Sequence, residues 1–318
     1  MNRFERKEEN TRMKWTGKKV ALVLGGGGVR GFSHIGVLKV LEEEGIGIDL
    51  IVGTSAGALI GGAYASGQTP GDIQAKIDAY LQSPEFDDSR MKSIGLSFSQ
   101  EEKNILKKAQ NFIMNRVLFV QAFFKPSILP SHDFQALMNY FLPDIDIKET
   151  RIPLRVVSSD LMTGRKIVFS EGPLRKVVLA SCAVPGAVEP VRYGDWLLAD
   201  GGITSLVPVH AARKAGADVV IAVTVDRDIQ TNVSIETAKD VVFRAGEITT
   251  SVLEASELAD ADVVIRPQVG GLHWMDFRRG IDLVKAGEDA ARESLNTITD
   301  SLPFYRRMAR FARRIFKK

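Results

Sequence analysis

The chain has 318 residues, of which 45% are hydrophobic and 25% are charged, as in a folded globular protein. This composition excludes disordered, collagen-like and coiled-coil rod proteins. The single cysteine, Cys182, excludes an internal disulfide and a Cys-rich zinc site. Neither an apolar leader nor a run of eighteen apolar residues is present, so we expect a cytoplasmic protein without a membrane-spanning helix.

The net charge of +3 comes from the C-terminus, because the last fifteen residues carry seven basic side chains and no acidic one. Without these seven charges the net charge is −4, which argues against nucleic-acid binding by the body of the protein. Apolar residues recur at helical spacing within 303–318, which predicts a basic amphipathic helix over 301–318. Such a helix is typical of peripheral contact with an anionic membrane, here the inner face, although packing on the body is the alternative. Residues 1–18 are also basic, and we expect a flexible arm there.

A βαβ unit is predicted near the start of the chain. Residues 20–24 form a continuous apolar run, as in a buried parallel strand. A glycine cluster and a helical pattern through Glu44 follow, and a second strand is predicted over 49–52. A helix ending at Gly67 comes next, and Pro70 indicates the first turn of another helix. Strand, helix and strand in about thirty residues indicate a right-handed crossover between parallel strands.

The rest of the chain alternates between strand and helix patterns. Further strands are predicted over 154–158, 166–169, 196–199, 219–225 and 263–265, and helices over 206–215 and 235–259. The alternation predicts a three-layer α/β/α sandwich around a mostly parallel sheet, formed by one domain over 19–300. Only the apolar segment 90–130 interrupts the rhythm, and we interpret it as a buried helix or as a lid over an apolar site.

The first motif is the glycine-rich segment GGGGVRG at 25–31. Gly26, Gly28 and Gly31 match the dinucleotide-binding fingerprint. However, the second strand does not end in the acidic residue that would bind the ribose, since Asp49 stands at its start. Glycines before a helix also direct bare backbone N–H groups at negative charge, as an oxyanion hole requires. We therefore favour an oxyanion hole over a dinucleotide site.

The second motif, Gly53-Thr54-Ser55-Ala56-Gly57, has the G-x-S-x-G pattern of a nucleophile elbow between a strand and a helix. The elbow predicts that Ser55 projects from the sheet edge beside a helix N-terminus, and an N-cap serine is the alternative. Parallel strands of a βαβ unit end at the same edge, so the glycine loop and Ser55 are expected to lie together.

A nucleophilic serine needs a proton acceptor, and the third motif offers one. Asp200-Gly201-Gly202 follows an apolar strand, so Asp200 is placed to accept the proton of Ser55 directly, although an Asx turn is the alternative. The histidines offer no comparable motif, and a packed or solvent-facing role is expected of His34 and His132. His210 and His273 fit the order Ser…His but lie in no recognisable motif.

In this order, the motifs GGGGVRG, GTSAG and DGG resemble the three signatures of the patatin-like phospholipases, especially the small bacterial members. The resemblance also covers DLMTGR at 160–165 and ASCAVPGAVEP at 180–190. It implies a Ser–Asp dyad with Ser55 as nucleophile and Asp200 as proton acceptor. It further implies an oxyanion hole and a basic residue that orders the loop, which by matching positions are the amides of Gly26, Gly27 and Gly28 and the side chain of Arg30. Plant patatins begin the first motif with Asp, whereas Gly25 stands here, and we expect this difference to tune activity.

The resemblance implies a serine lipid acyl hydrolase of the phospholipase A or lysophospholipase type, acting in lipid metabolism without metal or cofactor. A general carboxylesterase with the same site is the alternative. A dinucleotide-dependent oxidoreductase is less favoured because the ribose-binding acid is missing and Ser55 lies in an elbow motif. A membrane-associated scaffold without turnover is less favoured because Ser55 and Asp200 are both present.

Overall fold

The computed structural model describes residues 18–88, 129–226, 235–270 and 280–308, together with a few positions between these ranges. The predicted arm over 1–18, apart from Lys18, lies outside the described residues, as does most of segment 90–130. The predicted C-terminal helix is described only as far as Met308, and Phe304–Met308 form one helical turn.

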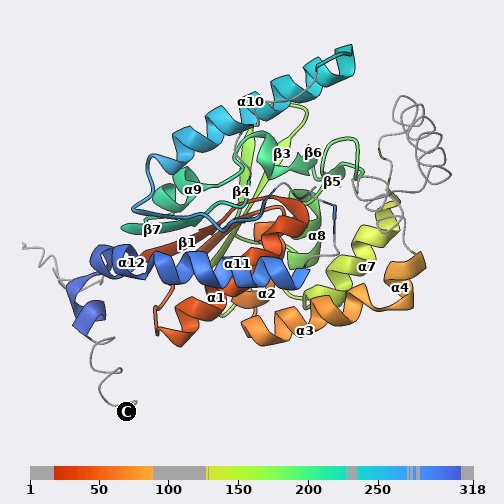
Figure 1. The fold of residues 1–318 in the computed structure, drawn as a ribbon. Coiled ribbons are helices and arrows are strands. Elements are labelled where there is room, and N and C mark those ends of the chain that lie inside the picture. The colour runs from red at the N-terminus through yellow and green to blue at the C-terminus, as the bar shows by residue number, and fades with distance from the viewer. Residues whose placement is uncertain are drawn as a thin grey trace, which may run out of the picture.

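The core of the fold is one mixed sheet of eight strands (Figure 1). The strands are β1 (Val20–Leu24), β2 (Leu50–Thr54), β3 (Leu154–Asp160), β4 (Lys166–Phe169), β5 (Val191–Tyr193), β6 (Trp196–Asp200), β7 (Val219–Val223) and β8 (Val263–Ile265). Seven of them follow the order β5-β6-β3-β2-β1-β7-β8, and β4 pairs with β3. All pairs along β3-β2-β1-β7-β8 are parallel, whereas β4, β5 and β6 form antiparallel pairs.

Helices cover both faces of the sheet. They are α1 (Ser33–Glu43), α2 (Ala56–Ala65), α3 (Pro70–Leu81), α4 (Pro84–Asp88), α7 (Ser131–Phe141), α8 (Leu174–Ser181), α9 (Val209–Lys214), α10 (Ala238–Leu258), α11 (Gly280–Glu293) and α12 (Leu295–Ser301). Helices α9 and α10 lie on one face, and α1, α2 and α11 lie on the other (Figure 1). Side chains of β1 alternate between the two resulting core clusters, which explains its continuous apolar run. The predicted three-layer sandwich with a mostly parallel sheet is confirmed.

Several predicted boundaries shift for local reasons. The glycine cluster leads first into a 3₁₀ turn, Gly28–Phe32, and only then into α1. The helix predicted over 206–215 begins at Val209 because it follows Pro208. The helix predicted over 235–259 begins at Ala238, after a capping box formed by Thr237 and Asp240. None of the described helices is long and apolar enough to cross a bilayer.

Strands β2 and β6 approach each other along β3 from opposite directions. Strand β2 runs parallel to β3 and ends with Thr54 opposite Val157. Strand β6 runs antiparallel and ends with Asp200 opposite Ser158. The two strand ends therefore meet at consecutive residues of β3, which brings the residues that follow them close together.

Candidate active site

Ser55 occupies a sharp turn between β2 and α2. Its backbone has φ 54° and ψ −123°, and it is the one non-glycine residue with positive φ among the described residues. Glycines on either side leave room for this turn. A Cβ on Gly57 would lie 2.1 Å from the Leu24 carbonyl oxygen, and one on Gly53 would lie 2.6 Å from the Gly57 carbonyl oxygen. The strained conformation costs about 1–3 kcal/mol, and the surrounding contacts offset it.

Asp200 is the carboxylate that the fold brings to Ser55. The Ser55 hydroxyl lies close enough to the Asp200 carboxylate to lower its pKa, and the N–H of Gly202 donates to Asp200 Oδ1 at 2.7 Å. A Cβ on the intervening residue, Gly201, would lie 2.3 Å from the Val157 carbonyl oxygen, so the chain passes close to β3 here. Burial raises the pKa of Asp200 to about 6, although the Ser55 hydroxyl and the Gly202 N–H oppose this rise. A carboxylate with a pKa this close to neutrality suits a general base.

The glycine loop lies against the nucleophile, but its four amides are not equivalent. The N–H of Gly25 donates to the Val223 carbonyl and that of Gly26 donates to the Leu206 carbonyl, both at 3.0 Å. The Gly26 N–H is thus already engaged in this structure, and its role in an oxyanion hole stays a prediction. Within the described part of the chain, the N–H groups of Gly27 and Gly28 have no hydrogen-bond acceptor, and Gly28 lines the same cavity as Ser55.

Arg30 binds the backbone of the glycine loop. Its side chain is buried, and its Nε donates to the Gly27 carbonyl at 3.1 Å. Its Nη1 forms an ion pair with Asp226 Oδ1 at 2.8 Å, just beyond β7. Because a peptide is planar and trans, holding the Gly27 carbonyl also fixes the direction of the Gly28 N–H. Asp226 was missed by sequence reasoning, since nothing in the sequence pairs it with a residue 196 positions earlier.

Each of the three described histidines has a partner other than Ser55. His34 is completely buried, and its Nε2 bonds the Gly25 carbonyl at 2.8 Å. Burial lowers the pKa of His34 to about 4, so the ring is neutral at pH 7 and this nitrogen donates. His132 is exposed, His210 pairs with Asp260 at 2.8 Å, and His273 lies outside the described residues.

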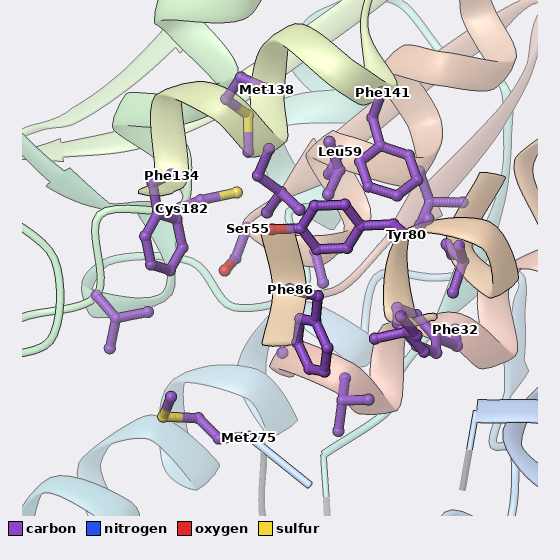
Figure 2. A pocket seen from close by; sticks show the side chains of 18 residues that line it. Phe32, Ser55, Leu59, Tyr80, Phe86, Phe134, Met138, Phe141, Cys182 and Met275 are labelled. Carbon is purple, nitrogen blue, oxygen red and sulfur yellow. The ribbon is translucent and has the colours of Figure 1, made fainter. Parts of the chain in front are cut away.

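An apolar cavity extends from Ser55 between α2, α3, α4 and α7. Figure 2 shows Ser55 facing the rings of Tyr80, Phe86, Phe134 and Phe141. Among the eighteen lining residues, side-chain hydroxyl or thiol groups belong only to Ser55, Tyr80 and Cys182, and the remaining side chains are apolar. Such a cavity suits a hydrocarbon chain.

Cys182 lies beside Ser55 in the cavity wall. Burial, reinforced by the charge of Asp200, raises the pKa of the Cys182 thiol far above its usual range. The thiol is therefore protonated at neutral pH, which makes it a poor nucleophile.

Comparison with known proteins agrees with this geometry. The profile of the family described as patatin-like phospholipase matches residues 22–213, which run from β1 to α9 and include Ser55 and Asp200. The chain belongs to the patatin-like phospholipase family. The predicted resemblance to this family is confirmed, and the family supports lipid acyl hydrolase activity in general.

Curated relatives extend beyond the aligned region. An uncharacterized NTE family protein of Mycobacterium tuberculosis is 30% identical over 225 residues, which cover 69% of this chain and 54% of the relative. Human patatin-like phospholipase domain-containing protein 6 is 32% identical over 221 residues, which cover 69% of this chain and 14% of the relative. The aligned region thus spans about half or less of each of these relatives. Among solved structures, VipD from Legionella pneumophila has a TM-score of 0.45 at 16% identity, over 88% of this chain and 67% of VipD.

Proposed function

We propose that the protein is a serine lipid acyl hydrolase of the phospholipase A or lysophospholipase type, with Ser55 and Asp200 as a catalytic dyad. One observation carries this proposal: a serine in a strained elbow lies beside a buried carboxylate and faces an apolar cavity. Substrate binding in this cavity would place an acyl chain among aromatic and aliphatic side chains and its ester carbonyl beside Ser55.

The proposed reaction is acyl transfer to water. Asp200 accepts the proton of Ser55 as the Oγ attacks the ester carbonyl, and the same proton passes to the departing alcohol oxygen. The N–H groups of Gly27 and Gly28 stabilise the tetrahedral oxyanion, and loss of one such donor typically costs about 2.7–4 kcal/mol. Asp200 then accepts a proton from water, whose oxygen attacks the acyl-serine, and the same proton passes to the departing Ser55 Oγ as the fatty acid is released. No step requires a metal or a cofactor.

The apolar cavity favours a lipid over a short ester. A general carboxylesterase would gain little from so many apolar contacts beyond the ester, whereas each buried methylene of an acyl chain contributes about 0.8 kcal/mol. We therefore expect kcat/KM to rise with acyl length for esters that share one leaving group. A flat dependence from butyrate to decanoate would favour the carboxylesterase alternative.

We further propose peripheral contact with anionic membranes through 303–318. Its first turn is attached to the body through Arg306, while Phe304 and Met308 are 75% and 51% exposed. Exposed apolar side chains beside basic ones suit an interfacial helix. Sedimentation with anionic vesicles, with and without residues 303–318, tests this contact, and failure of the full-length protein to sediment contradicts it.

The dyad is tested by fluorophosphonate labelling followed by intact-mass measurement. We expect labelling of the wild type, none of Ser55→Ala, and strongly slowed labelling of Asp200→Asn. Ser66→Ala is a matched control, since it removes a hydroxyl that donates to the Gly62 carbonyl at 2.7 Å at the far end of α2. A folded wild-type protein that remains unlabelled contradicts the proposal, and dinucleotide binding would be tested next.

A further inference from the structure

The hydrogen-bond ladder between β2 and β3 is interrupted at the elbow. Ile51 lies opposite Leu154, and its N–H donates to the Pro153 carbonyl at 2.9 Å. Because bonds of this kind recur at every second residue of a parallel pair, the regular pattern would continue from Ile51 through Gly53 to Ser55, whose N–H would donate to the Val157 carbonyl. No such direct bond forms between these two described residues.

A side chain from α8 takes the place of that bond. The N–H of Ser55 donates to the Oγ of Ser181 at 2.9 Å, and the Ser181 hydroxyl donates to the Val157 carbonyl oxygen at 2.5 Å. Ser181 is the last residue of α8 and is completely buried. One hydroxyl thus separates the two backbone groups and satisfies both of them, as buried polar groups require.

The position of this hydroxyl matters because the two halves of the dyad meet there. The Val157 carbonyl that accepts from Ser181 also lies against Gly201, directly after Asp200. Asp200 itself is paired with the next residue of β3, Ser158. The Ser181 hydroxyl therefore lies where β2, which leads into Ser55, diverges from β3, which pairs with the strand that ends in Asp200.

We propose that Ser181 is a positioning residue, whose hydroxyl holds the amide of Ser55 away from β3 and keeps the nucleophile in its elbow conformation. Without the hydroxyl, Ser55 either loses the partner of a buried N–H or closes onto the Val157 carbonyl. Closure moves the Ser55 Oγ relative to Asp200 and to the amides of Gly27 and Gly28. This inference rests on the proposed function, because the positioned group is the proposed nucleophile.

The neighbourhood of Ser181 supports a specific use of its hydroxyl. The other buried residues of α8 are all aliphatic, namely Leu174, Val177, Val178 and Ala180. Elsewhere in this core, a buried serine hydroxyl lacks a partner, as Ser158 shows. In contrast, the Ser181 hydroxyl uses both its donor and its acceptor capacity on the backbone beside the active site.

The test compares Ser181→Ala with Ser181→Thr, which retains a hydroxyl, using the full chain and a soluble p-nitrophenyl ester. For Ser181→Ala we expect kcat to fall about 10- to 100-fold, the range for misplacement of a reacting group by about 1 Å. KM should change less than about twofold, because the cavity wall is unchanged. The fluorophosphonate labelling rate should fall in parallel with kcat. Ser181→Thr should recover part of both rates, and Ser66→Ala should leave both unchanged.

Titration of active sites with the fluorophosphonate separates slow sites from missing ones. We expect Ser181→Ala to label slowly but to completion, with thermal unfolding close to that of Ser66→Ala. Normal kcat in a folded Ser181→Ala, or fewer sites that each react at the wild-type rate, overturns the inference. If Ser181→Ala does not fold, Ser181→Thr is the deciding variant. Labelling at the wild-type rate is expected only if its hydroxyl keeps both bonds, to the Ser55 N–H and to the Val157 carbonyl. An inactive wild type instead contradicts the proposed function.

Discussion

Polar groups have opposite environments at the two edges of the central sheet, where strands β1 and β2 end and where they begin. At the edge where β1 and β2 end, Ser55 is held at positive φ, and burial keeps the pKa of Asp200 near 6. At the edge where these strands begin, Asp49 accepts a hydrogen bond from the Val20 N–H at 2.8 Å. Both oxygens of Asp49 also accept from Arg306, at 2.6 and 2.7 Å.

The polar groups at the Asp49 edge stabilise the fold, whereas those at the Ser55 edge lower its stability. Asp49 and Arg306 each offset the charge of the other near solvent, whereas Asp200 is buried without a basic side chain among the causes that set its pKa. Active sites commonly keep such unfavourable groups because the reaction needs them. The comparison also places the first turn of the C-terminal tail at the edge opposite Ser55, because Arg306 binds Asp49 directly before β2.

The largest effect is expected from breaking the dyad. We expect Ser55→Ala to lower kcat by about 10³- to 10⁶-fold and Asp200→Asn by at least about 10³-fold, because each removes a group that takes part in bond making or proton transfer. Release of fatty acid from a lysophospholipid measures the loss. Retention of more than a tenth of wild-type kcat by either variant is incompatible with the assigned roles.

The same Asp200→Asn change should stabilise the protein at high pH. A carboxyl group whose folded pKa is raised loses stability as the pH rises from its unfolded value, 3.8, through its folded value of about 6. Removing this cost should raise the free energy of unfolding by up to about 3 kcal/mol at pH 8 and by only about 0.5 kcal/mol at pH 4.

Urea unfolding of wild type and Asp200→Asn at both pH values measures this stability change. The contribution of His34, whose pKa is lowered to about 4, has the opposite sign: its stability is lost as the pH falls below about 6.5. It cancels in the difference between the two proteins. Equal destabilisation of Asp200→Asn at pH 4 and pH 8 would show that Asp200 is not a buried, destabilising carboxylate.

Activity should follow the ionisation of the same carboxyl group. Only ionised Asp200 accepts the proton of Ser55, so kcat/KM should fall about tenfold per pH unit below about pH 6 and level off above it. A soluble ester, assayed between pH 4.5 and 8, gives the profile, and a parallel unfolding measurement confirms that the enzyme stays folded. A midpoint near pH 4 would contradict the effect of burial.

Sequence reasoning placed Ser55 and Asp200 at one sheet edge because both residues stand at the ends of short apolar strands, and such strands predict where a sheet edge lies. It did not predict that β6 runs antiparallel and meets β2 head-on, since the apolar run of a buried strand has no direction. Arg30 was assigned through a family resemblance. Its partner Asp226 and the ladder insertion by Ser181 arise from tertiary contacts that leave no local pattern.

A smaller and more specific fall in kcat is expected from a change that acts on the glycine loop, at the edge that carries Ser55. Asp226→Ala removes the partner of Arg30, which holds the Gly27 carbonyl, so the Gly28 amide should lose part of its orientation. We expect kcat to fall about tenfold, less than the loss of a whole oxyanion donor. Glu288→Ala is the control, since it breaks an ion pair with Lys39 at 2.7 Å between α11 and α1. An equal effect of both variants would point to a general loss of stability.

The smallest effect is expected at the opposite edge. Arg306→Ala removes the pairing with Asp49 and a hydrogen bond to the Gly47 carbonyl, and a partly exposed pair of this kind contributes about 0.5–1 kcal/mol. We expect that loss in the free energy of unfolding, with kcat on a soluble ester unchanged, because Ser55 and its partners lie at the other end of the strands. A matched fall in kcat would show that the two edges are coupled. The tail begins at the sheet edge opposite Ser55. If the residues after Arg306 make the membrane contact, Arg306→Ala should also leave vesicle binding intact.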